Sequence, residues 1–264
     1  YGLYQLGMIA PGRQADFVIL DNVTDLNVTD VYHCGKKIIR DEKAEIKPCP
    51  PYLKNTVHVS GFSEERLKLK HPGIKAHVIG MLERQIVTKD MIEEVPWIEK
   101  NGQKFFVSDG EYQKIAVIER HKNTGKMGVG IVKGYGIRGG AIASSVSHDS
   151  HNIIVVGDND HDMMLAVKEL IRDQGGYVLV CDGEIYGTLP LPVMGLMSDA
   201  GYEKVNAALG RMIPKAHEMG VKEGFDPFIT LSFMALPVIP EIRVTPRGIY
   251  LVNEDRMLVN PFLY

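Results

Sequence analysis

Short apolar runs separated by tight glycine turns recur along this chain and favour an architecture built from antiparallel hairpins. At Cys34-Gly35-Lys36 and at Asp182-Gly183, glycine can take the left-handed backbone conformation that a short hairpin turn requires. A third turn is predicted at Ser108-Asp109-Gly110. The strands predicted to flank these turns are 31–33 and 37–39, 177–181 and 184–189, and 105–107 and 114–119.

Only two segments have apolar residues at helical spacing, residues 160–174 and 199–220. Gly175-Gly176 predicts a left-handed cap after the first helix, and Pro214 predicts a kink or break near Ile213 in the second. No strand–helix–strand repetition is visible, so the pattern predicts a β-rich α+β fold. The remaining predicted strands are 17–20, 56–62, 75–82, 141–146 and 153–156.

A proline-rich segment, Lys47-Pro48-Cys49-Pro50-Pro51, predicts a connector between two units, because it can continue neither a helix nor a central strand. We therefore expect a first unit over residues 1–46 and a second over residues 52–264.

Composition excludes several classes of protein. Of the 264 residues, 45% are hydrophobic, which is too many for a disordered chain. The net charge of -3 argues against nucleic acid or an anionic membrane as partner, and no apolar stretch is long enough to span a bilayer. The three cysteines, Cys34, Cys49 and Cys181, lie far apart, which favours a reducing cytoplasmic location over a disulfide framework.

A G-x-G-x-x-G pattern at Gly134, Gly136 and Gly139 matches the dinucleotide-binding fingerprint, with Asp158 or Asp160 about twenty residues later. That fingerprint needs a helix directly after the glycines, and residues 141–146 read as a strand. Glycines in a turn are the favoured interpretation.

The densest group of reactive side chains lies between two apolar strands. A buried strand could not hold so many polar groups without leaving some unpaired, so we expect the segment to meet water, a ligand, a metal or a partner domain. Histidine beside aspartate is also how proteins orient an imidazole for proton transfer. The alternative is a hydrogen-bonded turn that happens to contain histidine. The candidate residues are Ser147, His148, Asp149, Ser150, His151 and Asn152.

Several segments resemble known proteins. Residues 7–21, from Gly7-Met8-Ile9-Ala10-Pro11-Gly12, resemble the segment after the barrel in the amidohydrolase superfamily. Gly139-Gly140-Ala141 through His151-Asn152 is similar to the carboxy-terminal region of bacterial adenine deaminases. So are the two segments 189–199 and 226–241. The resemblance covers nearly the whole chain.

The resemblance implies what each part does. Residues 1–46 would end the amidohydrolase β-sandwich, and residues 52–264 would form the carboxy-terminal domain of the deaminase. The family hydrolyses adenine to hypoxanthine and ammonia with a binuclear manganese or iron centre. Its ligands lie on a barrel of roughly 250 residues, which would precede Tyr1. No metal ligand or catalytic residue is therefore assigned in this chain, and the absence of any H-x-H sequence agrees with that.

Three hypotheses follow. The chain is a part of an adenine deaminase that is inactive without its barrel, with the 147–152 segment near adenine and a homo-oligomer as the expected assembly. Alternatively it is a non-catalytic structural or oligomerisation module. The third possibility, a freestanding metal hydrolase using His148, Asp149 and His151, has too few ligands for a complete metal site.

Overall fold

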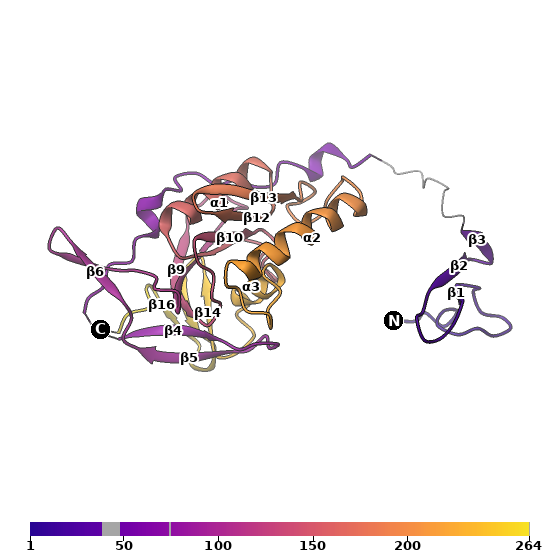
Figure 1. Ribbon diagram of the computed structural model, residues 1–264, viewed down its shortest axis with the longest axis horizontal. Helices are drawn as coiled ribbons and strands as arrows, with labels where there is room; N and C mark the ends of the chain where they lie inside the picture. Colours follow the sequence, from indigo (N-terminus) through magenta and orange to yellow (C-terminus); the bar gives the residue numbers. More distant parts are fainter. Residues whose placement is uncertain (39–47, 74, 264) are drawn as a thin grey trace. The chain divides into compact units, whose positions relative to one another are not determined.

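The computed structural model describes residues 1–38, 48–73 and 75–263 (Figure 1). The chain divides into two compact units, Tyr1–Pro48 and Cys49–Tyr264. The division lies within the proline-rich segment 47–51. The assignment of the two units to a β-sandwich end and a deaminase domain stays a prediction, and residues 39–47 lie outside the described residues.

The first unit contains one small antiparallel sheet, in the order β1-β2-β3. Its strands are β1 (Phe17–Leu20), β2 (Val28–His33) and β3 (Lys36–Ile38). The predicted strand at 17–20 and the hairpin at Cys34-Gly35 are confirmed, and both turn residues have positive φ, 50° and 75°. None of the described residues of this unit is buried. The sheet therefore depends on its own local contacts.

The second unit is built on an eight-stranded sheet in the order β13-β12-β10-β11-β8-β9-β4-β5. Neighbouring strands are antiparallel except β4 and β9, which run parallel. The sheet thus confirms the predicted α+β class. Its strands are β4 (Ala76–Met81), β5 (Thr88–Glu93), β8 (Tyr112–Ile118), β9 (Met127–Lys133), β10 (Gly140–Ser144), β11 (Ile153–Gly157), β12 (Gly176–Cys181) and β13 (Glu184–Pro190).

Both faces of this sheet are covered, because its central strands are apolar on both sides (Figure 1). In β10, Ala141 and Ala143 pack with α1 (Asp160–Arg172), whereas Ile142 points to the opposite core. That opposite core includes residues of α2 (Tyr202–Glu218), α3 (Ile229–Met234) and a small sheet. The small sheet consists of β14 (Ile242–Thr245), β15 (Gly248–Leu251) and β16 (Arg256–Leu258).

The remaining elements lie at the edges of the second unit. A separate two-stranded ribbon joins β6 (Trp97–Lys100) to β7 (Gln103–Phe106). Three short 3-10 helices are η1 (Pro51–Leu53), η2 (Glu64–Leu67) and η3 (Val252–Glu254). Among the described residues, none of the helices has the length and apolar character needed to cross a membrane.

One strand prediction and one hairpin prediction are wrong. Residues 56–62 form no strand: the Val57 amide donates to a side chain of Gln174, and the His58 amide donates to the Arg120 carbonyl. Residues 105–107 and 114–119 form no hairpin, because β7 pairs with β6 while β8 pairs with β9 and β11.

The helix predictions need smaller corrections. The second helix begins at Tyr202 rather than 199, and it continues through Pro214 to Glu218 without a break. At the end of α1 the left-handed residue is Gln174, with φ of 60°, followed by Gly175 at 106°. The Gly175 amide donates to the Leu170 carbonyl, so glycine still helps to close the helix.

Candidate functional site

The predicted polar segment joins two neighbouring antiparallel strands. Ser144 of β10 pairs with Ile154 of β11, and residues 145–152 connect them at one end of the large sheet. Exposure varies along the segment. Ser147 and Asn152 are buried, His148 and His151 are half-buried, and Asp149 and Ser150 are exposed.

Short hydrogen bonds fix the first half of this connection. The buried Ser145 hydroxyl donates to the Gly195 carbonyl at 2.6 Å and accepts from the Gly176 amide at 2.7 Å. The His148 amide donates to the Ser232 carbonyl of α3 at 3.0 Å. The His148 ring lies edge-on to Phe233 with centroids 4.9 Å apart. The imidazole is therefore positioned by α3 and is not a free surface side chain.

A buried arginine holds the second half. Arg120, 1% exposed, donates to three backbone carbonyls, those of His151 at 2.5 Å, Thr56 at 3.1 Å and Met194 at 3.0 Å. Burial lowers the pKa of its guanidinium to about 10, with the neighbouring Glu119 opposing the shift. Arg120 remains charged at neutral pH and links three segments that are distant in sequence.

Two polar atoms of the connection are buried and have no hydrogen-bond partner, Ser147 Oγ and His151 Nδ1. Burial is the main cause that lowers the pKa of His151, and the nearby His148 and Arg120 add to it. His151 is therefore neutral near pH 7. Each unpaired buried polar atom destabilises the fold by about 1–3 kcal/mol. The chain by itself leaves this segment incompletely satisfied.

The side chains of the connection form no group of three closely spaced metal ligands among the described residues. The rings of His148 and His151 lie 6.2 Å apart between centroids. Across residues 1–38, 48–73 and 75–263, three or more ligand atoms within 4.8 Å of one another occur in one group only, and it belongs to the first unit. His148, Asp149 and His151 do not form such a group, so we derive no metal-dependent step from them.

The glycine pattern at 134–139 serves the fold. The glycine segment leads into strand β10, not into a helix. The Gly139 and Gly140 amides donate to the Asp158 carboxylate at 2.5 and 3.0 Å. The Asp158 carboxylate thus occupies these two amides, which are not free to bind a phosphate. This agrees with the interpretation of the glycines as turn residues.

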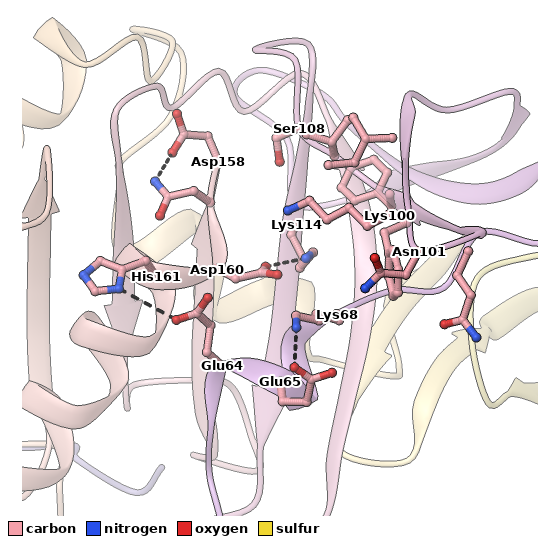
Figure 2. A pocket seen from close by; sticks show the side chains of 16 residues that line it. Glu64, Glu65, Lys68, Lys100, Asn101, Ser108, Lys114, Asp158, Asp160 and His161 are labelled. Atoms are coloured by element: carbon pink, nitrogen blue, oxygen red, sulfur yellow. Dashed lines mark hydrogen bonds and ion pairs between the residues drawn. The ribbon is translucent and has the colours of Figure 1, made fainter.

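A pocket of about 510 Å³ near the start of α1 is a second candidate (Figure 2). Most of its charged side chains are paired within the pocket: Lys114 with Asp160, Lys68 with Glu65, and His161 with Glu64 at 3.7 Å. Lys100 and Asp158 also line it, and Asp158 accepts backbone amides. Burial lowers the pKa of the Lys114 ammonium, although Asp160 opposes that shift. Such mutual pairing leaves little unbalanced charge with which to select a ligand.

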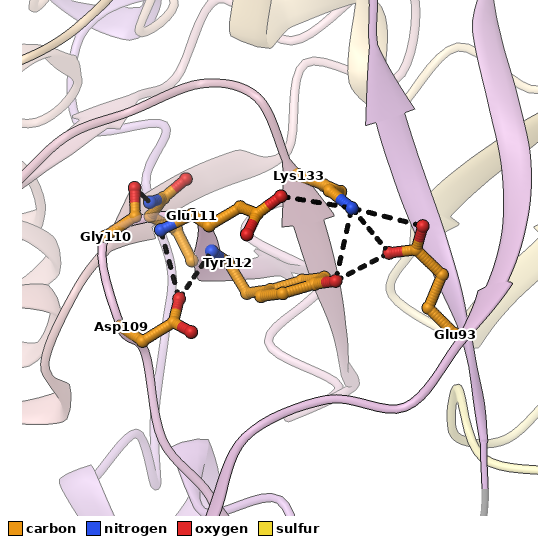
Figure 3. A network of polar contacts seen from close by, with 7 residues as sticks. Glu93, Asp109, Gly110, Glu111, Tyr112 and Lys133 are labelled. Carbon is orange, nitrogen blue, oxygen red and sulfur yellow. Dashed lines mark hydrogen bonds and ion pairs between the residues drawn. The ribbon is translucent and has the colours of Figure 1, made fainter.

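A third polar cluster, between β5, β8 and β9, is fully satisfied (Figure 3). Lys133 Nζ contacts Glu93 at 2.9 Å, Glu111 at 3.1 Å and the Tyr112 hydroxyl at 3.2 Å. The Tyr112 hydroxyl donates to Glu93 at 2.7 Å. Burial and Glu93 raise the pKa of Tyr112. We interpret this network as a structural clamp across three strands.

Sequence reasoning located the polar connection but missed the residues that support it. Arg120 lies two residues after the apolar run 115–118, and an arginine just past a strand end usually indicates a solvated charge. Phe233 and Ser232 belong to a helix of six residues, too short for a periodicity signal. No local pattern indicated that these residues meet the loop.

The second unit is a layered α+β domain. The connection between β10 and β11, at one end of its large sheet, contains two buried polar atoms without a hydrogen-bond partner. Residues 85–256 match the model of the adenine deaminase C-terminal domain, and the chain belongs to this family. It is 49% identical over 258 residues to an adenine deaminase of Desulfitobacterium hafniense, covering 98% of this chain and 45% of the relative. It is 42% identical to one of Nitratidesulfovibrio vulgaris (95% and 44%) and 41% identical to one of Clostridium acetobutylicum (98% and 46%). The chain thus spans less than half the length of these curated relatives.

Proposed function

We propose that this chain acts as the carboxy-terminal part of an adenine deaminase and that the 147–152 segment helps to close the catalytic site over adenine. The observation that carries the proposal is the pair of buried, unpaired atoms, Ser147 Oγ and His151 Nδ1. A small rearrangement on contact with a partner surface or a purine would give them partners. The gain would offset the present desolvation penalty and favour closure.

The side chains of the segment suit a heterocycle that carries both donors and acceptors. Neutral His151 can both donate and accept, and the exposed Asp149 carboxylate accepts only. The half-buried His148 is placed by Ser232 and Phe233, so it can meet a purine edge without a large loss of side-chain entropy. These residues would bind and orient the base and exclude water from it.

The remaining parts of the proposal concern the whole deaminase. Its divalent metal, manganese or iron in a binuclear centre, would supply the hydroxide nucleophile near neutral pH. The metal ligands would lie on a barrel outside these 264 residues, and this barrel is the main expected partner of the chain. Adenine as substrate, a role in purine salvage, a homo-oligomeric assembly and a cytoplasmic location belong to the same proposal.

The test is a chimera in which this chain replaces the matching 45% of the Desulfitobacterium hafniense relative. With the unsubstituted chimera active, we expect His148→Ala and His151→Ala each to lower kcat/KM for adenine at least tenfold, about 1.4 kcal/mol of transition-state stabilisation. His58→Ala, at an exposed position without an assigned role, is the matched control.

The same experiment separates the alternatives. Unchanged kcat and KM in both loop variants would overturn the proposed role and leave a structural or oligomerisation module. Adenine-dependent ammonia release by the 264-residue chain alone, with bound metal, would instead support a freestanding hydrolase.

A further inference from the structure

The turn between β2 and β3 brings together three side chains that can ligate or support a metal. His33 ends β2, and Cys34 follows it in the left-handed conformation, with φ of 50°. This backbone geometry turns the Cys34 thiol toward the imidazole, and Sγ lies 3.6 Å from His33 Nε2. On the other side of the ring, His33 Nδ1 lies 3.1 Å from Asp16 Oδ1. All three residues are exposed.

The separation of the two ligand atoms matches one metal geometry. A tetrahedral zinc ion with a Zn–N bond of about 2.05 Å and a Zn–S bond of about 2.3 Å holds these atoms about 3.6 Å apart. The observed distance between His33 Nε2 and Cys34 Sγ is 3.6 Å. The separation of the two atoms is therefore the one that two ligands of a single tetrahedral zinc ion require.

Asp16 has the position of a supporting residue. Metal-bound histidines commonly present their second ring nitrogen to a carboxylate, which fixes the tautomer and the ring orientation. The Asp16 carboxylate is itself held, because Oδ1 accepts from the Cys34 amide at 2.7 Å and Oδ2 accepts from the Gln14 side chain at 2.5 Å. One carboxylate thus orients both the imidazole and the residue that carries the thiol.

We propose that His33 Nε2 and Cys34 Sγ bind one Zn²⁺ ion, with Asp16 as the positioning residue. A thiolate and an imidazole favour zinc over magnesium or manganese, which prefer oxygen ligands. Two coordination positions stay open to water or to another ligand. The proposal is independent of the deaminase function. A nucleophilic thiol fits less well, because the pocket of about 280 Å³ that reaches Asp16 is lined by residues 8–11 and 13–17 and does not include Cys34.

The test uses the full 264-residue chain, reduced and metal-free. Titration with Co²⁺, a spectroscopic substitute for zinc, should produce a thiolate-to-cobalt charge-transfer band at one equivalent, and added Zn²⁺ should remove it. Zinc binding should release a proton, because the ligating thiol must lose its hydrogen. Cys34→Ser should abolish the band, whereas Cys49→Ser and Cys181→Ser should retain it.

The two other residues have distinguishable effects. His33→Ala should abolish one-equivalent binding, and the exposed His58 supplies the matched control, His58→Ala. Asp16→Asn should weaken zinc binding about 10- to 100-fold while the band at saturation stays, as expected for a residue that acts through a ligand. Nuclear magnetic resonance spectra of each metal-free variant verify that the hairpin has formed. No zinc binding by the unsubstituted chain, or binding that persists in both Cys34→Ser and His33→Ala, would overturn the proposal.

Discussion

Each unit of the chain contains a stacked aromatic pair with the same geometry. Phe17 and Tyr32 in the first unit, and Tyr177 and Phe228 in the second, both have ring centroids 4.6 Å apart and planes at 15°. Their surroundings differ. Phe228 is 1% exposed within a large core, whereas the first unit has no buried residue among those described. The same contact therefore supports a strand pair in one unit and a domain core in the other.

Removing one ring from each pair tests this difference most strongly. Phe228→Ala should lower the free energy of unfolding of the second unit by about 3–5 kcal/mol, because it leaves a cavity in the core. Phe17→Ala should lower that of the first unit by about 1 kcal/mol, close to the value of an aromatic contact alone. Urea unfolding followed by the single tryptophan, Trp97, reports the second unit, and amide signals of residues 1–38 report the first. Equal losses would contradict the comparison.

Arg120 tests whether buried polar contacts matter as much as apolar ones. Arg120→Ala leaves three backbone carbonyls without their donor and should destabilise the second unit by about 2–3 kcal/mol in the same urea experiment. Arg247 is exposed, and Arg247→Ala should change stability by no more than about 0.5 kcal/mol. A similar small change in both variants would show that the arginine contacts add nothing to the fold.

The same contrast explains which features could be predicted from the sequence. The turns at Cys34-Gly35 and Asp182-Gly183 depend on local backbone conformation, and both form as predicted. The position of the polar connection was also local, since apolar strands bound it on either side. The contacts that hold the connection in place could not be predicted locally, because Arg120 and Phe233 are distant in sequence and meet it only through tertiary packing.

Two other pairings were missed for different reasons. The parallel contact between β4 and β9 joins segments that no local pattern links. The pairing of β7 with β6 is local, because Asn101-Gly102, with φ of 51° and 71°, forms the turn between them, and this signal was overlooked. The grouping of Asp16 with His33 was missed because the two residues are 17 positions apart in the sequence. The adjacent His33-Cys34 before a glycine turn was the one local signal for it.

A carboxylate in each unit accepts backbone amides, which gives a third, smaller test. Partial burial raises the pKa of Glu119, but donors from Thr124, Lys122 and His121 outweigh it and lower the value to about 2. The ordinary value is 4.5, so this stabilisation is complete above about pH 4.5 and is lost as the pH falls toward 2. Glu119→Gln should cost about 1–2 kcal/mol at pH 7, after allowance for solvent screening, and should flatten the acid limb.

Asp16 is the matched carboxylate of the first unit. The Cys34 amide is the main cause that lowers its pKa, and the side chain is 35% exposed, so solvent screens its charge. Asp16→Asn should therefore leave the urea midpoint of either unit unchanged within the error of measurement. The stability of the second unit could instead fall with decreasing pH as steeply in Glu119→Gln as in the unsubstituted chain. That result would show that other carboxylates dominate its acid unfolding.

The last expected loss of stability should be equal in the two units, because it depends on the backbone alone. Gly35 and Gly183 hold the same turn position, with φ of 75° and 81°. A methyl group at Gly183 would meet no atom within 4 Å, and one at Gly35 would meet only Ala15 at 3.8 Å. Alanine at either position should thus cost about 1 kcal/mol through left-handed strain, with no contribution from packing. The urea and amide measurements described above report both variants. If Gly183→Ala lowered the free energy of unfolding much more than Gly35→Ala, packing would also contribute at this exposed turn of the second unit. The cost of the turn could then not be assigned to backbone geometry alone.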